Sequence, residues 1–227
     1  MTSEYNFISP EQIFDNEEIN ACIKQGNSNL GAMGYTEHGL PHAKKCSNFA
    51  RMILEELNFD KRSAELAAIA GYMHDIGNSV NRTDHAHSGA ILAYSILLRL
   101  NMLPEEAALV VSAIGHHDEK TAFPVNPIAA ALIIADKTDV RRSRVRDASE
   151  SNLTADIHDR VNFAVEKSRF NIDKNRKAMT FSLEIDTSIC PVMEYFEIFT
   201  DRMILCRKSA ESLGYRFELL INDARLL

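Results

Sequence analysis

Histidines and aspartates suited to binding a divalent metal recur along the first two thirds of the chain. They are His42, the adjacent pair His74 and Asp75, His87, the pair His116 and His117, and Asp136. Neutral imidazole and carboxylate are ligands of borderline and hard divalent metals. The four cysteines show no CxxC spacing, which excludes a thiolate-pair zinc motif. The pattern therefore predicts a metal centre built from nitrogen and oxygen ligands.

These residues fall within or near the ends of segments with helical periodicity or helix-start signals. The expected helices cover about 9–26, 41–58, 60–77, 88–100, 104–117 and 127–144, with a loop at 27–40. Because the ligands are scattered over five helices, the site can form only when the helices pack. The adjacent pair His74 and Asp75 can face one ion at a turn released by Gly77, and the carboxylate can bridge two ions.

In their order along the chain, His42, His74-Asp75-Ile76-Gly77 and Asp136 resemble the H…HD…D signature of the HD-domain metal-dependent phosphohydrolases, in its HDIG form. The resemblance covers about residues 38–146 and implies a helical bundle that binds divalent ions. Two positions depart from the family pattern. Asn78 stands where many members have lysine, and no glycine-tyrosine-proline motif follows the two histidines, which argues against the cyclic-di-GMP subset.

The resemblance implies one or two ions of Fe, Mn, Mg, Co or Ni. The first would be held by His42, His74, Asp75 and Asp136, with Asp75 as the catalytic carboxylate. The additional histidines resemble the two-metal subset, in which a second ion would use Asp75, His87 and either His116 or His117. His85, two residues before His87, is the alternative at that position, and the glycine-alanine context favours His87. Helical phase favours His117 and resemblance to an HHE form favours His116, so both stay open.

Five cations follow the last predicted ligand, in a chain whose net charge is −7: Lys137, Arg141, Arg142, Arg144 and Arg146. Arginine binds phosphate through two parallel hydrogen bonds. We expect Arg141 and Arg142 to hold the phosphate and stabilise the transition state, with Lys137 and His38 as weaker substrate-binding residues. The alternative is a solvated helix C-terminus favoured by its dipole.

The expected activity is hydrolysis of a nucleotide-like phosphoester or phosphoanhydride by a metal-activated water. A di-iron oxygenase on the same fold and a non-catalytic nucleotide-binding module are the alternatives. The acidic net charge gives no reason to expect a nucleic-acid or membrane partner, so a small phosphorylated molecule is the expected ligand. The absence of a signal peptide or an apolar segment long enough to span a bilayer predicts a cytoplasmic protein.

After about residue 147 the pattern changes from helical to alternating. Residues 179–185 and 215–221 alternate apolar and polar side chains, a third strand is expected around 161–165, and a helix is expected over 191–213. The expected fold is mainly α, with a helical metal-binding domain at 1–147 and a β-β-α-β unit at 148–227. We expect this unit to pack on the helices or to mediate homodimerisation, since so few strands are not stable alone.

Overall fold

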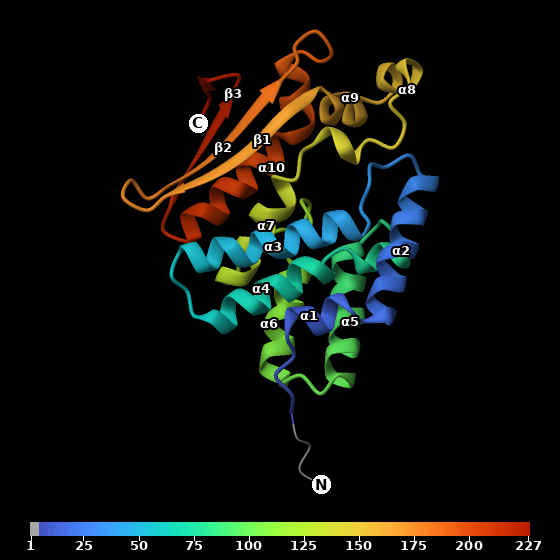
Figure 1. Ribbon diagram of the computed structural model, residues 1–227, viewed down its shortest axis with the longest axis vertical. Coiled ribbons are helices and arrows are strands. Elements are labelled where there is room, and N and C mark those ends of the chain that lie inside the picture. Colours follow the sequence, from blue (N-terminus) through green and yellow to red (C-terminus); the bar gives the residue numbers. More distant parts are fainter. Residues whose placement is uncertain (1–4) are drawn as a thin grey trace.

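A computed structural model describes residues 5–227 and shows a helical bundle followed by a small sheet with its own helix (Figure 1). The N-terminal helices are α1 (Pro10–Phe14), α2 (Glu17–Ala32), α3 (Leu40–Glu56), α4 (Lys61–Met73), the short 3-10 helix η1 (Ile76–Ser79), α5 (His85–Arg99), α6 (Pro104–Gly115) and α7 (Pro127–Lys137). The bundle and the sheet unit agree with the mainly α fold predicted from the sequence.

Helix α7 is the centre of the bundle, because every residue from Ile128 to Ala135 is buried. Its neighbours α3 and α4 pack closely against each other. A Cβ at Gly71 of α4 would lie 2.8 Å from the Ser47 backbone of α3, so only glycine permits this approach. The tight α3–α4–α7 packing brings His42, His74 and Asp136, one from each element or its end, toward a common space.

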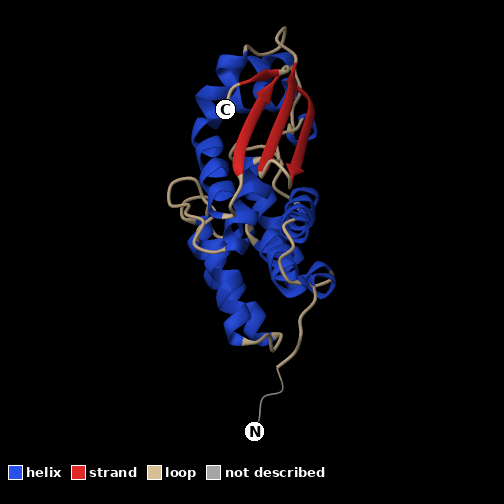
Figure 2. Cartoon of the chain, turned by 90° about the vertical axis from the view of Figure 1, so that its left-hand side faces the viewer, coloured by secondary structure: helices blue, strands red, loops and turns tan. Residues whose placement is uncertain are grey.

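The second part of the chain runs through η2 (Arg142–Arg144), α8 (Glu150–Ala155), α9 (Ile157–Ala164), β1 (Val165–Asp173), β2 (Ala178–Ile185), α10 (Val192–Ser212), β3 (Arg216–Ile221) and β4 (Ala224–Arg225). The sheet order is β1-β2-β3-β4, with β2 and β3 parallel and the other neighbours antiparallel. Helix α10 makes the crossover between β2 and β3. Figure 2 shows the sheet at one end of an elongated molecule, with helices behind it.

Three predicted boundaries are wrong. The helix expected over 9–26 is two helices, because the Asn16 side chain accepts a hydrogen bond from the Ile19 backbone and starts α2, which then continues to Ala32. The helix expected to run toward Arg144 ends at Lys137. The strand expected around 161–165 is mostly α9, which Asp156 caps by accepting the backbone N–H groups of its first turn. Among the described residues, no helix combines the length and the apolar character needed to cross a bilayer.

Candidate metal centre

Four side chains from α3, α4, α7 and the turn after α4 bring their metal-binding atoms together. His42 Nε2 lies 3.3 Å from His74 Nε2, 3.4 Å from Asp136 Oδ1 and 3.7 Å from Asp75 Oδ2. His74 Nε2 lies 3.4 Å from the same Asp75 oxygen. Ligands about 2.1 Å from one ion and at right angles to each other are about 3 Å apart. The four atoms therefore have spacings close to those of a single coordination shell.

A second group lies on the other side of Asp75. Its Oδ1 atom is 3.5 Å from His85 Nε2 and 4.0 Å from His117 Nε2, and the two imidazole nitrogens are 3.2 Å apart. Each carboxylate oxygen of Asp75 thus faces a different pair of imidazoles. This is the arrangement expected of a carboxylate shared by two ions. We refer to His42, His74, Asp75, His85, His117 and Asp136 together as the histidine–aspartate cluster.

All four imidazoles of the cluster are oriented by a hydrogen bond at Nδ1. His74, His85 and His117 donate to backbone carbonyl oxygens at 2.9, 3.1 and 2.6 Å, and His42 lies 2.8 Å from Asp139 Oδ2. Since these oxygens only accept, Nδ1 carries the proton in each ring and Nε2 keeps its lone pair. Such a bond commonly orients a metal-binding histidine. In its neutral form, each of the four rings therefore presents the lone pair of Nε2 to the interior of the cluster.

The contacts inside the cluster fit bound cations. Two lone pairs face each other in the His42–His74 contact and again in the His85–His117 contact, which is repulsive unless a cation or a proton lies between them. In addition, Asp75 Oδ2 is buried and has no hydrogen-bond partner among the described residues. A buried carboxylate oxygen without a partner is costly, and a divalent ion would satisfy it.

The pKa values within the cluster are set by two opposing effects, burial and the charges of neighbouring side chains. Burial acts to raise the pKa of Asp75, but the His74 imidazole outweighs it, so the pKa lies well below its usual value. Burial also opposes the charge of Asp136, yet Lys137 holds the pKa of that carboxyl well below its usual range. Burial lowers the pKa of His117 well below its usual value. Burial lowers the pKa of His74, but Asp75 and Asp136 outweigh it and raise that pKa, so a divalent cation bound by these carboxylates and imidazoles would compete with a proton on His74.

Asp139 contacts the cluster through His42 Nδ1 and contributes no atom to the interior of the cluster. Its carboxylate accepts from His42 at 2.8 Å, pairs with Lys45 at 2.7 Å and with Arg141 at 2.8 Å, and lies 3.7 Å from Arg144. The side chain has no exposed area. It therefore fixes the orientation of His42, a role that the sequence did not suggest because Asp139 lies outside the family motif.

The structure places His85, not His87, beside Asp75. His87 points away from the cluster and is exposed, whereas His85 is only 3% exposed. His116 also lies outside the cluster, because its Nδ1 atom donates to Ser112 O and its ring lines a neighbouring groove, so His117 is the member of that pair facing Asp75. The signal for His85 was the spacing of His85, Gly89 and Ala93, all buried on one face of α5.

The two arginines expected to bind phosphate do not face the cluster's open side. Arg141 is held by Asp139 and lies 3.6 Å from Glu37, while Arg142 donates to the carbonyl of Phe163 and stacks on that ring at 4.6 Å. The backbone becomes extended at Arg141 after α7, and neither arginine is among the residues that line the cavity described below. Lys137 is buried and pairs with Asp136 at 2.7 Å, which raises its pKa against the opposing effect of burial.

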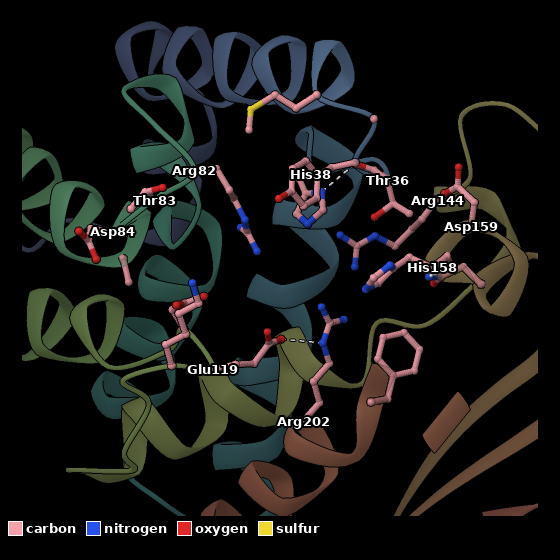
Figure 3. A pocket seen from close by; sticks show the side chains of 18 of the residues that line it. Thr36, His38, Arg82, Thr83, Asp84, Glu119, Arg144, His158, Asp159 and Arg202 are labelled. Carbon is pink, nitrogen blue, oxygen red and sulfur yellow. Dashed lines mark hydrogen bonds and ion pairs between the residues drawn. The ribbon is translucent and has the colours of Figure 1, made fainter. Parts of the chain in front are cut away.

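A cavity of about 510 Å³ lies next to the cluster: the cluster residues do not line it, but its wall includes His38, whose ring lies 5.4 Å from that of His42. Four basic side chains from separate parts of the chain also line it: Arg82, Lys120, Arg144 and Arg202. Figure 3 shows the guanidinium groups of Arg82, Arg144 and Arg202 pointing toward a shared space near His38. The cavity volume lies within the range of small-molecule sites. Arg202 comes from α10, so the C-terminal unit forms part of this wall.

Comparison with known proteins finds a family model and curated relatives that match part of this chain. A family model described as HD domain matches residues 40–161. The uncharacterized protein MJ1020 of Methanocaldococcus jannaschii is 31% identical over 163 residues, which is 60% of this chain and 62% of that protein. Ribonuclease Y of Deinococcus radiodurans is 31% identical over 115 residues, 48% of this chain and 18% of the relative.

Ribonuclease Y of Chlorobium luteolum is 35% identical over 123 residues, or 54% of this chain and 21% of the relative. The chain therefore spans less than two thirds of the length of each of these curated relatives. The matched family segment includes all seven predicted metal-binding positions, from His42 to Asp136, and extends into α9, whereas α10 and the sheet lie beyond it.

Proposed function

Because this chain belongs to the HD-domain family, we propose that it is a metal-dependent phosphohydrolase acting on a small, nucleotide-like phosphoester or phosphoanhydride. The observation that carries the proposal is the position of Asp75 between two pairs of imidazoles, with all four Nε2 atoms directed inward. Divalent ions held there would supply water activation and neutralise charge on phosphoryl oxygens.

The chain's own residues would bind and orient the substrate. Arg82 Nη1 lies 3.3 Å from His85 Nε2, and its guanidinium lies over the Tyr35 ring at 5.5 Å. No carboxylate among the described residues forms an ion pair with Arg82, so its charge is available to a phosphoryl group beside the cluster. We therefore assign to Arg82 the phosphate-binding role that the sequence analysis predicted for Arg141 and Arg142.

His38 lines the cavity and can accept a hydrogen bond there through Nε2. Its Nδ1 atom donates to Thr36 O at 2.7 Å, so Nε2 keeps a lone pair, and its ring lies 5.4 Å from that of His42. Burial lowers the pKa of His38 well below its usual value, which keeps the ring neutral. We propose that His38 Nε2 accepts a hydrogen bond from water or from a substrate hydroxyl.

The test combines metal analysis with a substrate panel. The protein would be loaded with Mn²⁺ or Fe²⁺ and offered mononucleotides, dinucleoside polyphosphates, cyclic nucleotides and a short oligoribonucleotide, the last because two relatives are ribonucleases Y. We expect Asp75→Ala to lose bound metal and to reduce hydrolysis to background, since both ion positions share this carboxylate. Glu211→Ala, which removes an exposed carboxylate on α10, should change neither.

Hydrolysis retained by Asp75→Ala would contradict the assignment. An iron-loaded protein that consumes oxygen but cleaves no phosphoester would support the di-iron oxygenase instead. Binding of nucleotide without turnover by the metal-loaded protein would support the non-catalytic module.

A further inference from the structure

Arg202 of α10 is held in a way that presents its guanidinium to the cavity. Its Nε atom lies 2.6 Å from Glu119 Oε1, and its guanidinium carbon lies 4.7 Å above the Phe199 ring. The first contact is an ion pair and not a hydrogen bond, because Arg202 Nε has no hydrogen-bond partner among the described residues, and the second is a stacking contact with the ring. The side chain remains 25% exposed, and Figure 3 shows its guanidinium directed into the shared space.

Glu119 also connects Arg202 to the histidine–aspartate cluster. The same carboxylate lies 3.3 Å from Lys137 Nζ, which in turn lies 2.7 Å from Asp136 Oδ2. Lys137 and Arg202 hold the pKa of Glu119 below its usual value against the effect of burial. Because Glu119 is shared by two cations, it does not use up the positive charge of Arg202.

Arg144 offers a second, independent indication of an anionic ligand. It is only 4% exposed, donates from Nε to Glu37 O at 2.9 Å and from Nη1 to Asp139 O at 3.0 Å, and lines the same cavity. Its Nη2 atom has no hydrogen-bond partner among the described residues. A buried donor without an acceptor is unfavourable, and an oxygen of a bound anion would satisfy it.

The positions of the three arginines imply two anionic groups in the ligand. Arg82 contacts the cluster directly at His85, whereas Arg144 is separated from the metal-facing nitrogen of His42 by Asp139. Arg202 is separated from Asp136 by Glu119 and Lys137. One phosphoryl group at the cluster can therefore contact Arg82, and a second group is needed to reach Arg144 and Arg202.

Carboxylates line the cavity on both sides of the part that Arg82, Arg144 and Arg202 line. Asp118 lies 3.9 Å from His85 on the cluster side, and Asp84 also lines the cavity. Asp156 and Asp159 of the α9 segment line the opposite side, and Asp159 Oδ1 is buried without a partner. These outer carboxylates favour hydroxyl or amino donors and disfavour a longer chain of phosphates.

We propose that this cavity binds a diphosphate-bearing substrate, with the reacting phosphoryl group at the cluster beside Arg82 and the second between Arg144 and Arg202. The inference rests on the proposed function and deepens it, because it selects a phosphoanhydride over a monoester. It also makes the C-terminal unit part of substrate recognition, since Arg202 lies outside the segment matched by the family model.

The test compares two inorganic ligands that differ by one phosphoryl group. Calorimetry on the Mn²⁺-loaded protein, at a fixed free Mn²⁺ concentration, would measure dissociation constants for orthophosphate and for the non-hydrolysable imidodiphosphate. We expect imidodiphosphate to bind about tenfold or more tightly, as charge-assisted hydrogen bonds to the second group require. Arg202→Met should abolish most of this difference while changing orthophosphate binding by less than about twofold.

Arg202→Lys keeps a charge beside Glu119 but loses the second edge of the guanidinium, so it should give an intermediate preference. Arg169→Lys on the exposed hairpin should behave as the unmodified protein. Equal binding of the two ligands by the unmodified protein, or equal weakening of both by Arg202→Met, would overturn the inference. If the preference for imidodiphosphate is found but no phosphoester is hydrolysed, the proposed function fails and the binding inference stands.

Discussion

The direction of each histidine follows from its hydrogen bond and from its place on the helix. Residues four apart on a helix share a face, whereas residues two apart point about 200° apart. His85 shares the buried face of α5 with Gly89 and Ala93, so His87 lies on the exposed side of the helix, where it lines the cavity and the neighbouring groove. The Nδ1 bond of His85 to Arg82 O then turns its Nε2 atom toward Asp75.

This difference between neighbours gives a prediction about metal content. We expect His85→Ala to lower the content of bound metal from two ions to one, because it removes a ligand from the pair that faces Asp75 Oδ1. His87→Ala should keep both ions, since its imidazole is outside the cluster. Elemental analysis of the purified variants after dialysis checks this, and equal metal loss in both variants would contradict it.

Sequence order could predict the first four positions of the cluster but not all of its surroundings. His42, His74, Asp75 and Asp136 lie in a motif whose order along the chain is visible, and the structure brings them together. The directions of Arg141 and Arg142 depend instead on the turn after α7, where the backbone becomes extended at Arg141. That turn is decided by tertiary contacts with Asp139 and α9, which no local pattern reports.

At the scale of elements, the junction between η1 and α5 positions the two halves of the cluster. A Cβ at Gly77 would lie 2.0 Å from His85 O and 2.6 Å from Gly89 N, so only glycine allows this contact. The approach holds His85 next to Asp75. Gly77 lies within η1 and has no positive φ, so glycine is needed here for the close packing of η1 against α5.

Substituting Gly77 should consequently disturb both stability and the second ion position. We expect Gly77→Ala to lower the free energy of unfolding by about 3 kcal/mol, the upper end of the usual cost of overpacking. In a chain of this size that corresponds to a Tm about 6–12 °C lower. Calorimetry at constant metal concentration measures the change.

Gly115→Ala is the matched control, because a Cβ there meets only Ala90 at 3.8 Å. It should leave Tm unchanged or raise it slightly, since alanine has the higher helix propensity. If the two variants had the same Tm, the close approach of η1 and α5 would not be the reason for glycine at position 77.

The element boundaries show where local signals were sufficient. Helix α10 and the alternating strands β2 and β3 agree with the periodicity seen in the sequence, and Gly214 follows the helix with a positive φ of 81°. The region before β1 was misassigned because α9 is short and amphipathic, and its alternating apolar residues resemble a strand. The cap at Asp156 was the local signal for a helix.

At the scale of the whole molecule, the sheet unit and the bundle meet around the cavity. Helix α10 supplies Phe199 and Arg202 to its wall, while α9 supplies Asn162 and its neighbours. Helix α10 packs against α7, and Figure 1 shows α10 between the sheet and the bundle. Homodimerisation through this unit stays a prediction.

The buried imidazoles make the stability of the whole fold depend on pH. Burial lowers the pKa values of His38, His85 and His117, so each contributes stability that is present above the ordinary histidine pKa of about 6.5 and lost as the pH falls. The pKa of His74 is raised, because Asp75 and Asp136 outweigh the effect of burial. Its contribution has the opposite sign, being present below about pH 6.5 and lost as the pH rises.

Three lowered pKa values against one raised value predict that the metal-free protein is less stable at pH 5.5 than at pH 7.5. Bound metal should make the stability of the protein depend more steeply on pH, because an ion competes with protons for the same Nε2 lone pairs. The increase in Tm produced by Mn²⁺ over EDTA should therefore shrink between pH 7.5 and pH 5.5. Thermal unfolding with Mn²⁺ and with EDTA, at pH 7.5 and at pH 5.5, measures this increase in Tm. An increment that stays constant or grows at the lower pH would mean that the imidazole nitrogens of the cluster do not hold the metal.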